Sequence, residues 1–208
     1  MESKHSKIIT IFAVLLFIVG YACREEISDL VWEGVDAPQS VEDMKAWYAA
    51  NKPENISFRS SDGKEKIPMK PEWSRAFAMK RGQWEAVETD VMMQGKILYV
   101  NEDCMKKYKE TNDPKYMESY THIVFQINRK TNDTIAFLMT VVPNLAWLEK
   151  SNFKPFMKVA YLYRSKDFGG KVLFHSFDGR FYNGWVYEKG EIVRAIKSYP
   201  DLLTTLPQ

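Results

Sequence analysis

The C-terminal half of the chain consists of short segments in which apolar and polar residues alternate, each followed by a turn sequence. Asp178-Gly179 separates residues 171–177 from residues 180–187, and Lys189-Gly190 leads into residues 192–196. Two-residue turns of this composition join neighbouring antiparallel strands. No intervening stretch is long enough for the crossover helix that a parallel β-α-β unit requires, which argues against a Rossmann-type enzyme.

The same alternation occurs earlier in the chain and extends the predicted sheet. Residues 84–92 and 97–100 indicate a hairpin around Gly95, and further strands are expected at residues 122–128, 134–142 and 157–164. Together, the alternating segments predict about seven or eight strands. We therefore predict an α+β fold for residues 71–197: an antiparallel β-meander with one or two flanking helices, built either as an open sheet or as a partly closed barrel.

Residues 23–70 are expected to form a tether, an amphipathic helix and a linker. After Ser40, a predicted helix N-cap, one helical face carries an apolar stripe of Val41, Met44, Trp47 and Tyr48. Three prolines mark residues 52–72 as a surface loop or linker. The stripe fits packing on the sheet or, alternatively, binding to a partner. A second, charged helix is expected at residues 102–109, and residues 198–208 are predicted to be a tail.

Residues 1–22 have the pattern of an export signal. Lys4 and Lys7 precede an apolar run at residues 8–19 that only Thr10 interrupts. Twelve residues are too few for a helix that crosses a bilayer, which needs about 20. A cleaved signal peptide is therefore the main interpretation, and an uncleaved anchor is the alternative.

The residues that follow carry a resemblance to a known class of proteins. Gly20-Tyr21-Ala22-Cys23 resembles a bacterial lipobox, and residues 168–193, with their Asp-Gly and Asn-Gly-Trp turns, resemble a segment of uncharacterised lipoproteins of Bacteroidetes-type bacteria. This resemblance implies lipidation of Cys23 and a lipid anchor in the outer membrane, on its periplasmic or its surface face. Ordinary cleavage after Ala22, which leaves Cys23 unmodified, remains the alternative.

Charge excludes one broad class of partner. The chain has 29 Lys and Arg against 27 Asp and Glu, a net charge of +2. A general nucleic-acid binder needs a larger basic excess to neutralise phosphates, so no nucleic-acid partner is expected.

The search for catalytic groups finds no complete constellation. Cys104 with His122 or His175 would form a Cys-His pair, but the acidic neighbours Glu102 and Asp103 disfavour a thiolate. Metal-ligand spacings, phosphate loops and dinucleotide motifs are absent from the sequence, so no catalytic residue, metal site or cofactor is assigned.

Carboxylates on one predicted strand are the remaining catalytic candidates. Glu85, Glu88 and Asp90 lie close together, and Glu88 and Asp90 share a face because they are two residues apart. A glycosidase needs two carboxyl groups at a defined separation. A solvated strand face is the simpler interpretation.

Aromatic residues support a binding role. Trp147 falls in a predicted loop at residues 146–155, while Tyr161, Tyr163 and Trp185 fall on adjacent predicted strands. Such rings stack on glycans and peptides, although the same alternation also builds a core. We assign these four residues as candidate ligand contacts in a non-enzymatic envelope lipoprotein that binds or scaffolds a partner. The alternatives are a secreted hydrolase with a non-obvious site and a subunit of a larger cell-surface assembly.

Overall fold

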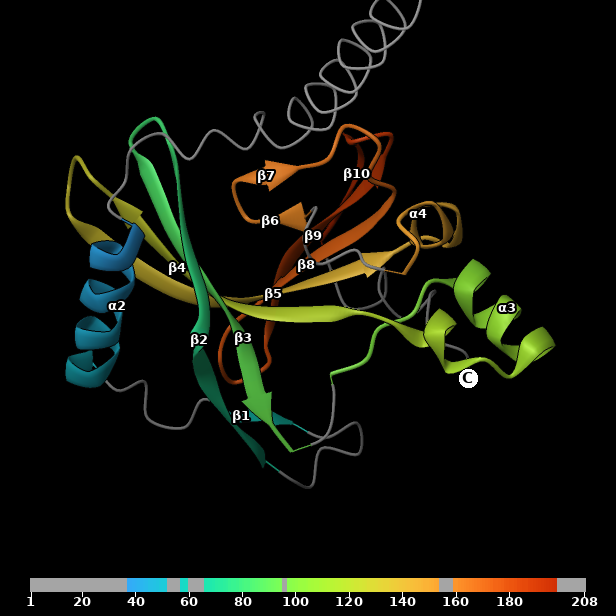
Figure 1. Cartoon of the computed structure of the whole chain (residues 1–208), viewed down its shortest axis with the longest axis horizontal. Helices are drawn as coiled ribbons and strands as arrows, with labels where there is room; N and C mark the ends of the chain where they lie inside the picture. Colours follow the sequence, from blue (N-terminus) through green and yellow to red (C-terminus); the bar gives the residue numbers. More distant parts are fainter. Residues whose placement is uncertain (1–36, 52–56, 60–65, 95–96, 154–158, 198–208) are drawn as a thin grey trace, which may run out of the picture. The chain divides into compact units, whose positions relative to one another are not determined.

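The fold is taken from a computed structural model, which describes residues 37–51, 57–59, 66–94, 97–153 and 159–197. In these residues, eight strands form one antiparallel sheet in the order β1-β2-β3-β4-β5-β8-β9-β10, and β6 and β7 form a separate pair (Figure 1). The order ends at β1 and β10, so the sheet is open and not a closed barrel. The predicted α+β class and antiparallel sheet are confirmed.

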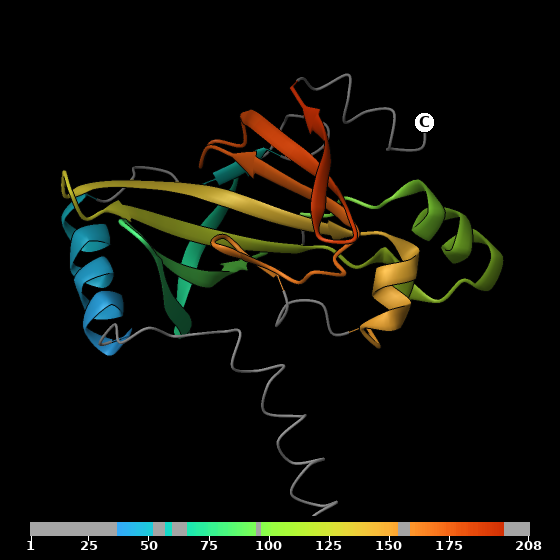
Figure 2. The ribbon, with the colours of Figure 1, turned by 90° about the horizontal axis from the view of Figure 1, so that it is seen from above.

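The strands of the large sheet are β1 (Ser57–Arg59), β2 (Lys66–Arg81), β3 (Trp84–Met93), β4 (Tyr120–Asn128), β5 (Asp133–Pro143), β8 (Gly170–His175), β9 (Phe181–Glu188) and β10 (Glu191–Ile196). The small pair is β6 (Val159–Ala160) and β7 (Tyr163–Arg164). The helices are α2 (Ala37–Asn51), α3 (Glu102–Thr111) and α4 (Leu145–Lys150), with a 3-10 turn, η1 (Pro114–Met117). Figure 2 shows α2 near one end of β4 and β5, and α3 and α4 near the other.

Helix α2 packs on one face of the sheet. In the β3–β4 register Val87 pairs with Phe125, and both side chains are fully buried on this face. Trp47 and Tyr48 meet the Phe125 ring edge-on, at centroid distances of 5.9 and 6.1 Å. Met44 is buried in the same cluster. The predicted apolar stripe of α2 therefore packs on the core, as the first of its two interpretations expects.

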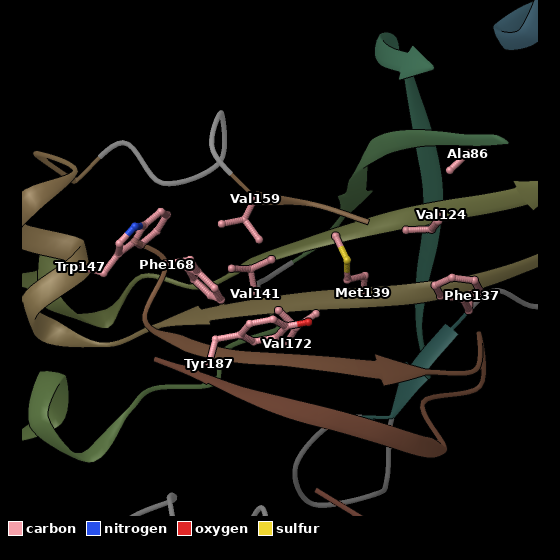
Figure 3. Packing of buried hydrophobic residues seen from close by; sticks show 10 residues of the cluster. All are labelled: Ala86, Val124, Phe137, Met139, Val141, Trp147, Val159, Phe168, Val172 and Tyr187. Atoms are coloured by element: carbon pink, nitrogen blue, oxygen red, sulfur yellow. The ribbon is translucent and has the colours of Figure 1, made fainter. Parts of the chain in front are cut away.

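The opposite face carries a second apolar cluster, which spans the sheet from β3 to β9. Figure 3 shows its ten residues: Ala86, Val124, Phe137, Met139, Val141, Trp147, Val159, Phe168, Val172 and Tyr187. Val159 belongs to β6 and is almost fully buried in this cluster. The β6–β7 hairpin is therefore held against this face of the sheet.

Strand β2 corrects the expected linker. It begins at Lys66, inside the segment predicted as linker, and runs for 16 residues. Its N-terminal residues pair with β1 only through Lys66–Pro68, so no described strand borders Pro71 on that side of β2. Proline is tolerated at such an edge because no partner needs its missing N–H. The segment from Lys66 to Pro71 therefore has a composition typical of a loop, although it forms part of a strand.

The predicted strand at residues 97–100 is not formed. The Ser119 hydroxyl donates to the Ile97 carbonyl oxygen at 3.3 Å and accepts from the Tyr99 N–H at 3.2 Å. A side chain thus makes backbone hydrogen bonds that a neighbouring strand would otherwise make. Strand β3 pairs instead with β2 and β4. The expected turn residue Gly95 lies outside the described residues.

Residues 146–164 differ from the prediction in two ways. A helix, α4, replaces the first half of the predicted loop at residues 146–155, because the Asn144 side chain accepts the Trp147 N–H at 2.9 Å and caps its first turn. The predicted strand at residues 157–164 is a short hairpin with a turn at Tyr161-Leu162, and residues 154–158 lie outside the described part. Strand β5 consequently pairs with β8, and the meander skips β6 and β7.

The start of α2 also differs from the prediction. The helix begins at Ala37, so Ser40 lies inside it, and its hydroxyl donates to Glu85 Oε1 instead of capping the helix. No helix in the described ranges is both long and apolar enough to cross a membrane. The predicted signal at residues 1–22, Cys23 and the tail at residues 198–208 lie outside the described residues.

Candidate functional site

Two titratable side chains are buried side by side on the face that carries β6 and β7. Glu88 on β3 is 0% exposed, and His122 on β4 is nearly as buried. Asp90 pairs with His122 across the two strands, which places His122 diagonally beside Glu88 on the same face. His122 Nδ1 lies 3.8 Å from Glu88 Oε2 and 3.8 Å from Asp90 Oδ1.

The β6–β7 hairpin covers these groups and contributes two more polar side chains. The Tyr161 backbone N–H donates to Glu88 Oε1. The Tyr161 hydroxyl donates to Gln126 Oε1 on β4 at 3.0 Å, so the turn of the hairpin is fastened to both strands. Arg164 follows on β7. We call Glu88, Asp90, His122, Tyr161 and Arg164 the Glu88 cluster.

The Arg164 guanidinium contacts a carbonyl oxygen, a sulfur and an aromatic ring. Its Nη1 donates to the Tyr163 carbonyl oxygen at 2.7 Å, and its Nη2 faces the sulfur of Met139 at 3.7 Å. The guanidinium carbon stands 5.7 Å from the centre of the Tyr187 ring. Among the described residues, no ion pair within 4 Å involves Arg164. The Tyr187 hydroxyl and the Glu88 carboxyl also interact with this buried positive charge.

Three buried atoms of the cluster lack a hydrogen-bond partner in the described part of the chain: Glu88 Oε2, His122 Nδ1 and Arg164 Nε. Buried polar atoms are almost always paired, with protein groups or with ordered water. Leaving one unpaired costs about 1–3 kcal/mol. A polar group from outside the described residues would therefore complete these hydrogen bonds.

Burial dominates the electrostatics of the cluster. It raises the pKa of Glu88 to about 7, against a lowering influence of the Tyr161 N–H and of Arg164. Burial also lowers the pKa of His122, although Asp90 opposes this effect, and it lowers the pKa of Arg164. Glu88 can therefore gain or lose a proton near neutral pH, which a carboxyl group in water does not do.

The cluster reaches the surface through Asp90. The Asp90 carboxylate pairs with Arg75 at 2.8 Å, and 34% of its side chain is exposed. Arg164 and Tyr161 also keep part of their surface, although Arg164 Nε is buried. These three side chains are the partly exposed members of the Glu88 cluster.

The four predicted aromatic contacts do not form one exposed surface. Trp147 is 3% exposed and packs edge-on against Phe168, with 4.9 Å between ring centres, because α4 turns the indole into the core. Trp185 is half-buried on the same apolar cluster, and Tyr163 is half-buried on β7. Of the four, Tyr161 alone belongs to the Glu88 cluster. The expectation that Trp147 lies in a loop is thus wrong.

The catalytic pairing of Cys104 is not formed. Its sulfur lies 3.7 Å from the Pro143 carbonyl oxygen, and burial together with Asp103 raises the pKa of the thiol to about 12. His175 lies on the face opposite His122, with its Nε2 3.2 Å from the Tyr99 hydroxyl. Glu85 also points to the opposite face, where it accepts from Arg129 Nε at 2.5 Å. Glu88 and His122 are the candidates that the fold brings together.

Arg164 is the site residue that sequence reasoning missed. A single arginine at the end of a predicted strand carries no motif, and its place on the hairpin that bonds to Glu88 depends on the turn at Tyr161-Leu162. The described ranges contain no group of three or more His, Cys, Asp or Glu side chains that could hold a metal ion. Comparison of the chain with protein-family models, curated proteins and solved structures finds no match.

Proposed function

We propose that the chain is a membrane-anchored lipoprotein of the bacterial cell envelope whose β-rich domain binds an extracellular or periplasmic glycan or peptide at the Glu88 cluster. One observation carries the binding role: Glu88 Oε2, His122 Nδ1 and Arg164 Nε are buried without partners in the described residues. A hydroxyl, amide or carboxyl group of a ligand would supply these missing hydrogen bonds. Each bond completed in this way would contribute about 1 kcal/mol or more.

Binding is tested by calorimetric titration of the mature protein with glycan fragments and short peptides. Arg164→Gln should weaken binding by about tenfold or more, because it removes a charge-assisted donor. Arg180→Gln is the matched control, since Arg180 is exposed on the turn before β9. Equal affinities of the two variants and the wild type would contradict a role of the cluster.

The anchoring part of the proposal rests on the N-terminal sequence, in which a short apolar run leads to Cys23. Mass spectrometry of the protein isolated from membranes should find an acylated Cys23 as the first residue. Cys23→Ser should release the protein from the membrane fraction. Recovery of the wild-type protein from the cytosol with Met1 attached would contradict the proposed membrane anchoring.

A hydrolase is the second candidate, and one specific observation favours it. The Glu88 carboxyl, whose pKa burial raises to about 7, lies 3.8 Å from an imidazole nitrogen. Groups that exchange protons near neutral pH are suited to general acid–base catalysis. Release of products from glycans or peptides by the wild type, and its loss in Glu88→Gln, would favour the hydrolase. Glu188→Gln, at an exposed strand position, is the control.

A further inference from the structure

The unpartnered atoms of the Glu88 cluster differ in what they can accept or donate. Arg164 Nε always carries a hydrogen and can only donate. His122 Nδ1 donates when the imidazole hydrogen is on that nitrogen, and Glu88 Oε2 donates when the carboxyl group is protonated. With Glu88 neutral, each of the three buried atoms can therefore offer a hydrogen to a ligand group.

Arg164 adds a charge argument to this hydrogen-bond argument. Buried arginines are normally paired with a carboxylate or another anion. Here the two Nη groups face a backbone carbonyl oxygen and the sulfur of Met139, and no carboxylate lies within 4 Å among the described residues. When Glu88 is protonated, an anion placed at Nε would supply the counter-charge that Arg164 then lacks.

We infer that the group bound at this site is a carboxylate of the ligand, which accepts hydrogen bonds from Arg164 Nε–H and from the protonated carboxyl group of Glu88, with His122 Nδ1–H as a third donor. This inference rests on the proposed binding function and specifies its ligand. A carboxylate is planar and accepts through two oxygens, which matches the donor fork of an arginine.

The protonation of Glu88 is part of the binding equilibrium. The groups that face Glu88 are His122 from β4, Asp90 from its own strand, and Tyr161 and Arg164 from the hairpin. The Asp90 carboxylate is ion-paired with Arg75 from β2 at 2.8 Å. Two adjacent carboxylates repel each other, so ligand binding to ionised Glu88 takes up one proton from solvent. The pKa of about 7 for Glu88 keeps this proton available near neutral pH.

Two kinds of natural ligand carry such a group in the cell envelope: uronic acids of glycans and the C-terminal carboxylate of peptides. Both present the same chemistry to Arg164 and Glu88. N-acetylglycine serves as the peptide probe and the methyl glycoside of glucuronic acid as the glycan probe, and the one that binds more tightly than acetate identifies the source. Acetate serves as the common minimal probe, and acetamide as its neutral isostere.

The experiment is an NMR titration that follows the Tyr161 backbone amide, which bonds to Glu88. At about pH 6, acetate should bind saturably and acetamide about tenfold more weakly or not at all. Arg164→Gln should lose acetate binding, and Arg180→Gln should keep it. Above pH 7, acetate affinity should fall by about tenfold per pH unit in the wild type. In Glu88→Gln, whose amide donates at every pH, affinity should not depend on pH in this range.

The possible failures are distinguishable. If acetamide, methylammonium or inorganic phosphate binds at the Tyr161 amide as tightly as acetate, the carboxylate inference is overturned and the binding function stands. If none of these probes, glycan fragments or peptides binds, the inference and the proposed function fail together. A pH dependence that persists unchanged in Glu88→Gln overturns the role of the Glu88 proton, whether or not Arg164→Gln folds.

Discussion

Glu88 Oε2 lies 3.8 Å from His122 Nδ1, and both atoms are buried beneath the β6–β7 hairpin. This distance is too long for a hydrogen bond between the two side chains. The two groups are close enough to interact electrostatically, but neither completes the hydrogen bonds of the other. The protonation of Glu88 should be visible in the stability of the protein.

Glu88→Gln should change how stability depends on pH. Burial raises the pKa of Glu88 from 4.5 to about 7 in the folded protein, so the folded state holds the proton more tightly than the unfolded state. The contribution of Glu88 is therefore fully present below about pH 4.5 and is lost as pH rises through 7. Relative to Glu88→Gln, the free energy of unfolding of the wild type should fall by about 3 kcal/mol over this range.

Urea unfolding of both proteins at several pH values measures this difference, and Glu188→Gln controls for loss of an exposed carboxylate. A constant difference between wild type and Glu88→Gln from pH 4.5 to 8 would show that Glu88 has an ordinary pKa.

His175→Phe should make the protein less sensitive to acid. His175 is fully buried, and burial lowers its pKa from 6.5 to about 4. The unfolded chain gains the proton first, so wild-type stability contributed by neutral His175 is lost as pH falls from 6.5 through 4, by about 3 kcal/mol. The phenylalanine ring keeps an aromatic neighbour for Tyr99 and Phe181 but does not titrate. Thermal unfolding between pH 4 and 7 should show a shallower decline in the variant; parallel declines would refute the assignment.

Phe125→Ala should destabilise the domain strongly. The Phe125 ring is fully buried and touches Trp47 and Tyr48 of α2 as well as Trp73, which stacks on it at 5.4 Å. Removing a buried phenylalanine side chain costs about 3–5 kcal/mol. Ile135→Ala on the neighbouring strand is the control, because Ile135 is 55% exposed and should cost under about 1 kcal/mol. Similar unfolding midpoints of the two variants would argue against this packing.

Cys104 should not react with thiol reagents in the folded protein. Its sulfur is buried, and burial raises the pKa of the thiol to about 12, whereas reagents attack the thiolate. In Cys23→Ser protein, a disulfide reagent should label Cys104 only after unfolding in guanidinium. Rapid labelling of the native protein would contradict its burial and reopen the question of a cysteine nucleophile.

The antiparallel sheet could be predicted because its strongest signals are local. Asp178-Gly179 closes the β8–β9 hairpin and Lys189-Gly190 the β9–β10 turn, with positive φ angles at Lys189 and both glycines. Local sequence signals predicted the wrong element where contacts distant in the sequence determine the backbone conformation. At residues 97–100 the Ser119 hydroxyl takes the backbone hydrogen bonds of Ile97 and Tyr99. In β2, Pro71 lies beyond the residues that pair with β1.

The candidate site could be predicted only in part. The period of two places Glu88 and Asp90 on one face, but it does not reveal whether that face meets water or a hairpin. Glu88 is fully buried, and the Tyr161 N–H, 73 positions later in the chain, bonds to it. Arg164 enters the site by the same long-range contact. Such packing depends on the whole fold and leaves no motif in the sequence.

A crystal structure of the mature protein grown with acetate at about pH 6 would test the site most directly. We predict density for a carboxylate that bridges Arg164 Nε and Glu88 Oε2, with the Tyr161 N–H still bonded to Glu88 Oε1. A direct ion pair between Arg164 and Glu88, with no ligand or water between them, would contradict the account.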